Sequence, residues 1–209
     1  MIPVINQLEQ SVPPLEYERY LRFQERLRKR RRELLLFCEH PALVTAGVQA
    51  RPENLLSTEA QLTDEGVSLI RVGRGGDYTA HEPGQCVIYP HLDLKKRSWT
   101  VSDFFREMLM ITSRCIQEIW QIKLESDTDA PGLYDPSGAK LVSIGIMFKS
   151  FFTSHGLAVN VSNPLDTFRH IHPCGYSELA MTSIADHGGD PALMPRFIAL
   201  WRQSLEERL

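Results

Sequence analysis

The sequence has no long hydrophobic run and no large excess of charge of either sign. Its longest apolar stretches, such as Leu34 to Cys38, are far shorter than the roughly 20 residues that a membrane-spanning helix needs. The formal net charge is only -3 over 209 residues, so charge alone indicates neither nucleic acid nor a membrane surface as a partner. The first residues also lack the basic start and apolar segment of a secretory signal, and no arginine precedes Arg19.

Cysteine is scarce, and its four copies are scattered. Cys38, Cys86, Cys115 and Cys174 lie far apart with no CxxC pair, which argues against a disulfide framework. We interpret them as reduced thiols of a cytoplasmic protein. Two or three of them are expected to be buried as small hydrophobic side chains, and at most one to be reactive.

Secondary-structure patterns predict a single α+β domain over residues 1–209. The spacing of apolar residues after Pro14 predicts a first helix, and capping residues at Thr100 and Asp190 predict the starts of two more. Two alternating segments, 140–148 and 154–162, predict a β-hairpin with a five-residue connection. The C-terminal helix is expected to turn four side chains inward: Leu193, Phe197, Leu200 and Leu205. Since helices and strands do not alternate as regular βαβ units, we predict a mixed, mostly antiparallel sheet with flanking helices.

A run of positive charge ends the first predicted helix. Six of the seven residues from Arg26 to Arg32 are arginine or lysine. A solvated helix end suits the C-terminal pole of the helix dipole, and a docking patch for an acidic partner is the functional alternative. No DNA- or RNA-binding motif accompanies the run, so we expect no nucleic-acid partner.

Cys174 is the strongest candidate for chemistry, in the segment FRHIHPCGY. Pro173 fixes the backbone before it, and Gly175 lets the backbone pass close to a ligand after it. A thiol on such a loop can be presented at a cleft. His170, His172 and Cys174 also alternate as HxHxC, but no second ligand cluster exists, so a structural zinc site is the less favoured interpretation.

Lys140 is the second candidate. It begins a strand whose same-face residues are apolar, so its amine is either partly buried or extends past the strand end into water. Burial would lower its pKa and allow proton exchange near neutrality. On the opposite face, small residues at 143, 145, 156 and 158 predict a narrow apolar slot, although close approach of a helix would also explain them.

The glycine-rich turn GRGGD at 73–77 matches no nucleotide motif, since it has neither GxxxxGK[ST] nor GxGxxG. It implies close approach of the backbone to another group, with Arg74 as a possible contact. His81 and His155 are candidates for polar groups in the same cleft, and a structural role is the more common one for a lone histidine.

Taken together, these segments resemble the lipoyl(octanoyl) transferase family, the octanoyl-acyl carrier protein:protein N-octanoyltransferases. The matching segments are RGGDYTAHEPGQ, GAKLVSIGI, TSHGLAVNV and HPCGY, and more weakly LLLFCEHPALVTAG. Their order and spacing cover most of the chain. The resemblance implies the fold of biotin and lipoate protein ligases.

The resemblance also implies site residues. The acyl-thioester cysteine falls on Cys174 and the lysine that tunes it on Lys140. The substrate-binding residues fall on Arg74, Gly75, Gly76, Asp77, Tyr78, Thr79, Ala80, His81, Ser143, Ile144, Gly145, Gly156, Leu157 and Ala158. Two positions depart from the family pattern, since Glu82 replaces a glycine and Ala180 an arginine, and neither departure removes a catalytic group.

The implied reaction moves an octanoyl group from octanoyl-acyl carrier protein to a lysine amine of a lipoyl domain, the first step of protein lipoylation. The acceptors would be lipoyl domains of 2-oxoacid dehydrogenase complexes and the glycine cleavage H protein. A Cys174 thioester intermediate would require neither cofactor nor ATP, and we expect a cytoplasmic monomer. The alternatives are an ATP-dependent lipoate protein ligase of the same fold and a non-catalytic acyl-binding protein.

Overall fold

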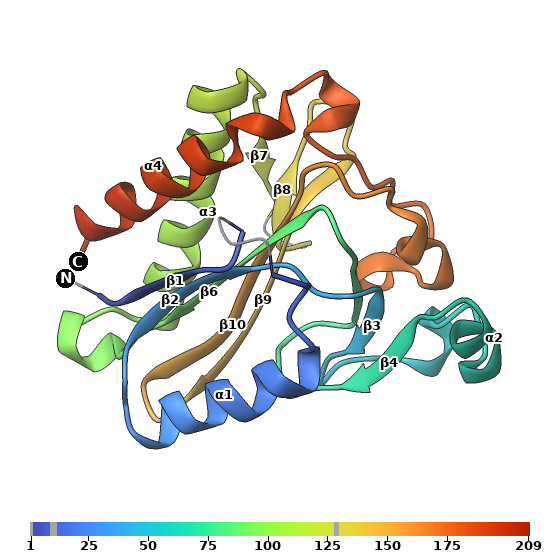
Figure 1. The fold of residues 1–209 in the computed structure, drawn as a ribbon, viewed down its shortest axis with the longest axis horizontal. Coiled ribbons are helices and arrows are strands. Elements are labelled where there is room, and N and C mark those ends of the chain that lie inside the picture. The colour runs from blue at the N-terminus through green and yellow to red at the C-terminus, as the bar shows by residue number, and fades with distance from the viewer. Residues whose placement is uncertain (1, 9–11, 128–129) are drawn as a thin grey trace.

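A seven-stranded sheet forms the centre of the computed structural model, which describes residues 2–8, 12–127 and 130–209 (Figure 1). Its strand order is β1-β2-β6-β10-β9-β8-β7, with β1 and β2 parallel and the other neighbours antiparallel. The strands are β1 (Val4–Asn6), β2 (Leu34–Cys38), β6 (Gln85–His91), β7 (Glu125–Ser126), β8 (Gly132–Tyr134), β9 (Lys140–Lys149) and β10 (Phe152–Asn160). The predicted mixed, mostly antiparallel sheet is confirmed.

A smaller sheet of three strands lies beside it, in the order β4-β3-β5. These strands are β3 (Leu43–Ala46), β4 (Ser68–Arg71) and β5 (Tyr78–His81). The pair β3 and β4 is parallel, whereas β3 and β5 are antiparallel. The glycine-rich turn at 73–77 connects β4 to β5 and therefore lies at the junction of the two sheets.

Helices cover both faces of the large sheet (Figure 1). Among the described residues, the α-helices are α1 (Tyr17–Lys29), α2 (Glu59–Asp64), α3 (Val101–Trp120) and α4 (Met194–Glu206). Helices α3 and α4 pack on one face and α1 on the other, because alternate residues of each strand point to opposite faces. None of the described helices is both long and apolar enough to cross a lipid bilayer.

The N-terminus of α3 shows why the sequence forms a helix there. The Thr100 hydroxyl accepts from the Asp103 N–H at 3.0 Å, and the Asp103 carboxylate accepts from the Thr100 N–H at 3.0 Å. This capping box satisfies backbone donors that would otherwise lack partners. Cys115 points from this helix into the core, as the spacing predicts.

The β9–β10 hairpin is tighter than predicted. Lys149 pairs with Phe152, so the connection is the two residues Ser150 and Phe151 and not five. Their φ angles are 52° and 62°, and positive φ at both positions gives a turn whose twist matches that of the strands. Serine and phenylalanine are not the residues that signal such a turn, which is why the first strand was predicted to end one residue early and the second to begin two residues late.

The buried face of α4 also differs from the prediction. Phe197 and Leu205 are buried as expected, but Leu193 and Leu200 are only partly buried, whereas Ile198 and Trp201 lie in the core. The α-helix begins at Met194, after a short 3-10 turn at Pro191–Leu193. Its residues therefore face other directions than they would in an α-helix that begins at Pro191.

The basic run lies at the hairpin turn. Arg31 forms an ion pair with Asp93 at 2.5 Å and donates to the Ser150 carbonyl at 2.8 Å. Ser150 follows Lys140 by ten residues, so at about 3.3 Å per residue the run is roughly 30 Å from Lys140. Within the run, Arg28 and Lys29 are also paired, both with Glu25.

Candidate active site

Cys174 lies on a short 3-10 turn, Pro173–Gly175, whose backbone brings the sulfur to the edge of a cavity. Its own φ is 56° and that of Gly175 is 82°. A side chain at Gly175 would start 3.1 Å from the amide of Asn54 and 3.1 Å from the carboxylate of Asp77. The turn is therefore pressed against neighbouring loops, and glycine is needed both for the conformation and for the space.

The Lys140 ammonium donates to the Cys174 sulfur over 3.1 Å, although the two residues are 34 positions apart. Lys140 is fully buried and Cys174 is partly exposed. Gly132 on β8 makes room for the lysine, since a Cβ there would lie 2.2 Å from the Lys140 Cε. The structure thus brings together the two residues proposed from sequence as the catalytic pair.

The pKa of Lys140 is raised, which is opposite to the direction predicted from burial. Burial is the largest single influence and does lower this pKa, but the sulfur of Cys174 and the phenol group of Tyr134 together raise it by more. The sequence could indicate that the lysine is buried. It could not indicate that an anion-forming thiol and an aromatic ring would be its neighbours.

A narrow cavity of about 50 Å³ extends from Cys174 between the two sheets. It is lined by thirteen of the fourteen predicted substrate-binding residues, all except Ala80, which is buried elsewhere. The small residues Ser143, Gly145, Gly156 and Ala158 form its β9–β10 wall, as their alternation predicts. These small residues therefore line a narrow slot, as predicted, and do not mark the close approach of a helix.

Four further lining residues close the cavity on the α1 side: Tyr17, Val87, Tyr89 and His155. His155 has a φ of 61° and is held in place by hydrogen bonds with the Tyr17 hydroxyl at 3.3 Å and the Gln24 amide at 3.2 Å. Such strain, of order 1–3 kcal/mol, persists only where surrounding contacts hold the residue.

The histidines of this wall are neutral. Burial lowers the pKa of His81 to about 3, with His40 and Arg74 adding to the effect. Burial likewise lowers the pKa of His155 to about 3. Burial also raises the pKa of Tyr17 to about 12, so these rings act as uncharged walls and not as acids or bases near neutral pH.

Arg74 shapes the cavity from the glycine-rich turn. Its guanidinium donates to Thr45 and to the carbonyls of Gly75 and Asp77, over 2.7 to 3.1 Å. These five hydrogen bonds engage all of its N–H groups. Arg74 therefore holds the turn onto β3 and brings a buried positive charge near Cys174, with its donors directed to the protein.

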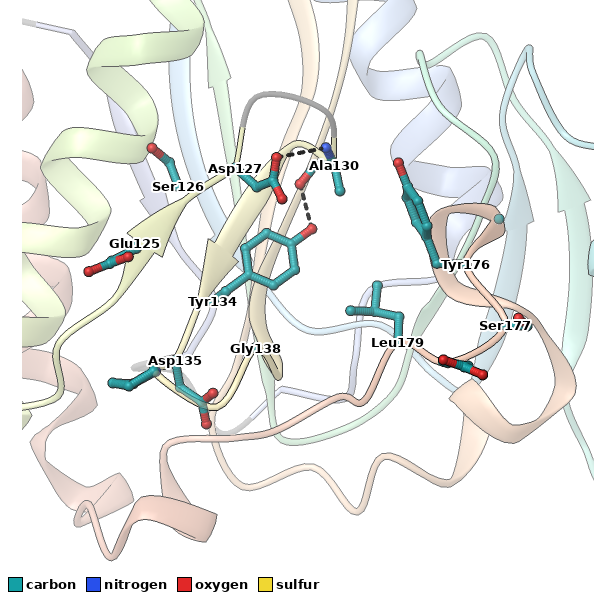
Figure 2. Close-up of a pocket in the computed structure, with 13 residues that line it drawn as sticks. Glu125, Ser126, Asp127, Ala130, Tyr134, Asp135, Gly138, Tyr176, Ser177 and Leu179 are labelled. Atoms are coloured by element: carbon teal, nitrogen blue, oxygen red, sulfur yellow. Dashed lines mark hydrogen bonds between the residues drawn. The ribbon is translucent and has the colours of Figure 1, made fainter.

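A second, wider hollow is lined by Tyr134, which contacts Lys140, and by Gly175, which follows Cys174 (Figure 2). This open pocket measures about 860 Å³ and is bordered by β7, β8 and the segment that follows Cys174. Tyr134 and Tyr176 stand on facing sides of it in Figure 2. Cys174 thus lines the narrow cavity, and residues next to the pair line the wide opening.

The metal interpretation receives no support from the described part of the chain, where no three His, Cys, Asp or Glu side chains group closely enough to hold an ion. His170 instead bonds to the Ser57 hydroxyl at 2.8 Å and pairs with Glu65 at 3.5 Å. The short turns at 166–170 and 173–175 break the extended geometry that HxHxC alternation assumes.

The two departures from the family pattern have structural roles in this chain. Glu82 is buried and accepts hydrogen bonds from the Asn163 amide at 2.9 Å and from the N–H and hydroxyl of Thr167 at 3.0 and 2.7 Å. It thereby ties the end of β5 to the loop that precedes the Cys174 turn. The Ala180 carbonyl accepts from the Lys140 N–H at 2.8 Å, a backbone contact that does not depend on the side chain.

Comparisons with known proteins agree with the fold and with the geometry of the candidate site. The family model described as the lipoyl protein ligase A/B catalytic domain matches residues 12–206. A solved lipoate-protein ligase A bound with ATP superposes with a TM-score of 0.74 at 14% identity, covering 99% of this chain and 85% of that one. The fold is therefore that of the lipoate protein ligase catalytic domains.

Similarity to curated sequences is closer. An octanoyltransferase of Leptospira interrogans is 47% identical over 87% of this chain and 85% of that protein, and one of Leptospira borgpetersenii is 45% identical over 93% and 91%. A third, from Alkaliphilus metalliredigens, is 35% identical over 84% and 83%. The chain belongs to the octanoyltransferase family.

Proposed function

We propose that this chain transfers an octanoyl group from octanoyl-acyl carrier protein to a lysine amine of a lipoyl domain, through a thioester on Cys174. The observation that carries the proposal is the 3.1 Å contact between the Cys174 sulfur and the buried Lys140 ammonium, at the mouth of a narrow cavity. One chain supplies both groups, so residues 1–209 act as a single catalytic domain and a monomer suffices. A free thiol at this position suits the reducing cytoplasm.

In the first half-reaction, the Cys174 thiolate attacks the carbonyl carbon of the donor thioester. The bond between that carbon and the carrier's sulfur breaks, and Lys140 gives its proton to the departing thiolate. An ordinary thiol is mostly protonated at neutral pH, so the ammonium is needed to favour the reactive form. The energy of the donor thioester is kept in the new one, and no ATP is consumed.

In the second half-reaction, the acceptor amine attacks the Cys174 thioester and Lys140 takes up a proton from it. The change of role follows from the two opposing influences on the lysine. Burial lowers its pKa whether or not the enzyme is acylated, whereas the Cys174 sulfur raises that pKa only while it can carry negative charge. Acylation removes the second influence, so Lys140 loses its proton more readily and serves as the base. Cleavage of the C–S bond restores the ion pair.

The narrow cavity is the proposed site of the octanoyl chain and the open pocket the proposed route for the protein-bound groups. The basic run 26–32 is the proposed docking patch for the body of an acidic carrier protein. It lies near the β9–β10 turn, about 30 Å from Lys140 at about 3.3 Å per strand residue, so its proposed contact is with that body and not with the reacting thioester.

The direct test is incubation with octanoyl-acyl carrier protein in the absence of ATP, followed by intact-mass spectrometry. We expect one octanoyl group per chain, removable by hydroxylamine and absent from Cys174→Ser, and its transfer to an added lipoyl domain. A ligase would form no adduct without ATP, and its activity with lipoate and ATP would survive Cys174→Ser. An acyl-binding protein would hold the fatty acid without covalent attachment, and either result would overturn the proposal.

A further inference from the structure

The Lys140 ammonium is enclosed by an aromatic ring as well as by the thiol. Its Nζ lies 5.1 Å from the centroid of the Tyr134 ring, and Tyr134 also lines the open pocket. An ammonium within about 6 Å of an aromatic face is attracted by the negative charge density of that face, and the attraction grows as water is excluded. Lys140 is fully buried, so the contact is made where it is strongest.

An irregularity in the strand pairing aims Tyr134 at the lysine. Leu133 pairs with Val142, but Tyr134 pairs with Lys140, so the register between β8 and β9 shifts by one residue there. A bulge of this kind redirects side chains and is frequent beside active sites. In regular pairing Tyr134 would lie opposite Leu141, and the contact with Lys140 would be lost.

The ring is also anchored at its far end. Its hydroxyl donates to the Ala130 carbonyl, as Figure 2 shows, and this bond sets the orientation of the ring in the wall of the open pocket. Gly132, two residues earlier on the same strand, leaves the space that the lysine stem occupies. Both residues of β8 that meet Lys140 therefore serve its placement.

We propose that Tyr134 is a positioning residue for catalysis, whose ring holds the Lys140 ammonium against the Cys174 sulfur. The ring stabilises the charged form of the lysine, and the charged lysine in turn stabilises the thiolate. Three other charged groups act nearby: Arg74 interacts with Cys174, Asp77 interacts with Arg74, and Asp127 interacts with Tyr134. The test variants leave all three unchanged.

The test is the pH dependence of Cys174 alkylation by iodoacetamide, which reports the thiolate and requires neither substrate. The other three cysteines are buried, and Cys174→Ser supplies the background. Tyr134→Leu removes the aromatic face and should raise the midpoint pH of alkylation by about 0.5–1 unit, because ammonium–aromatic contacts of this kind have that strength. Tyr134→Phe keeps the face and removes only the hydroxyl with its contacts to Ala130 and Lys140, so its midpoint should stay closer to the wild-type value than that of Tyr134→Leu.

Phe148→Leu is the matched control, since it makes the same aromatic-to-leucine change at the exposed far end of β9. A midpoint for Tyr134→Leu that equals that of Phe148→Leu would overturn the proposal. Should the leucine variant fail to fold, a series of phenylalanines with increasing ring fluorination at position 134 keeps the shape and weakens the ring's attraction for cations. The midpoint should then rise along the series, and a flat series would overturn the proposal.

The inference rests on the proposed catalytic pair, but its outcome is separable from that of the transfer reaction. Alkylation measures the Cys174–Lys140 pair alone. A shifted midpoint in a protein that forms no octanoyl adduct would support the positioning role and reject the proposed function, whereas transfer with an unshifted midpoint would do the reverse.

Discussion

Replacing Lys140 by methionine should remove the charge beside Cys174 while keeping a linear side chain of similar length. At 3.1 Å and an effective dielectric constant of about 20, the Coulomb attraction between an ammonium and a thiolate is about 5 kcal/mol. Cys174 is partly exposed, and water weakens the attraction further, so we take about 3 kcal/mol as the working value. That energy corresponds to about 2 pKa units, and because an ordinary thiol is only about 3% ionised at pH 7, it raises the thiolate fraction and the rate by at most about 30-fold at neutral pH.

The assay has two parts. In the first, alkylation of Cys174 at pH 7 should be slowed by up to about 30-fold in Lys140→Met, and the difference should vanish above about pH 10, where any thiol is ionised. In the second, the rate of octanoyl-enzyme formation should fall at least as much. Any octanoyl-enzyme that forms should then persist, since no base remains to take the proton of the acceptor amine.

Two further variants sharpen the comparison. Lys149→Met removes a lysine from the opposite, exposed end of the same strand and should change neither rate. Lys140→Arg keeps the charge but is too large for the space beside Gly132, so it should restore little activity. Alkylation of Lys140→Met within threefold of the wild-type rate at pH 7 would refute the ion-pair reasoning.

Two other consequences concern the cavity and its histidine wall. Ala158→Leu fills the narrow cavity and should reduce transfer of an octanoyl group far more than transfer of a butyryl group from the matching carrier thioester; equal losses would contradict the cavity as the acyl site. Acidification should destabilise the protein, because four buried histidines have pKa values lowered to about 3 or 4 by burial: His40, His81, His91 and His155. The unfolded chain takes up these protons first, so stability is full above pH 6.5 and falls by up to about 1.4 kcal/mol per pH unit for each histidine toward pH 4. Urea unfolding at pH 7.5, 6 and 5 measures this, and an unchanged free energy of unfolding would contradict it.

Much of the site was predictable because local patterns carry it. Pro173 and Gly175 mark the exposed turn of Cys174, and the small residues at 143, 145, 156 and 158 mark the cavity wall, since alternation assigns them to one face. Tyr17 and Tyr89 were missed as lining residues. They come from α1 and β6, and nothing near them in sequence signals that their rings close the cavity.

The amino-acid sequence by itself determined the α+β class and most of the longer helices and strands, because spacing, caps and turn residues act over a few neighbouring positions, and it offered Cys174 and Lys140 as candidates. Only the tertiary structure decided what surrounds Lys140. The strand order brings Cys174 to its amine, and the bulge between β8 and β9 turns Tyr134 toward it. These two neighbours reverse the effect of burial on the lysine's pKa, and such reversals depend on distances between side chains that no linear pattern contains.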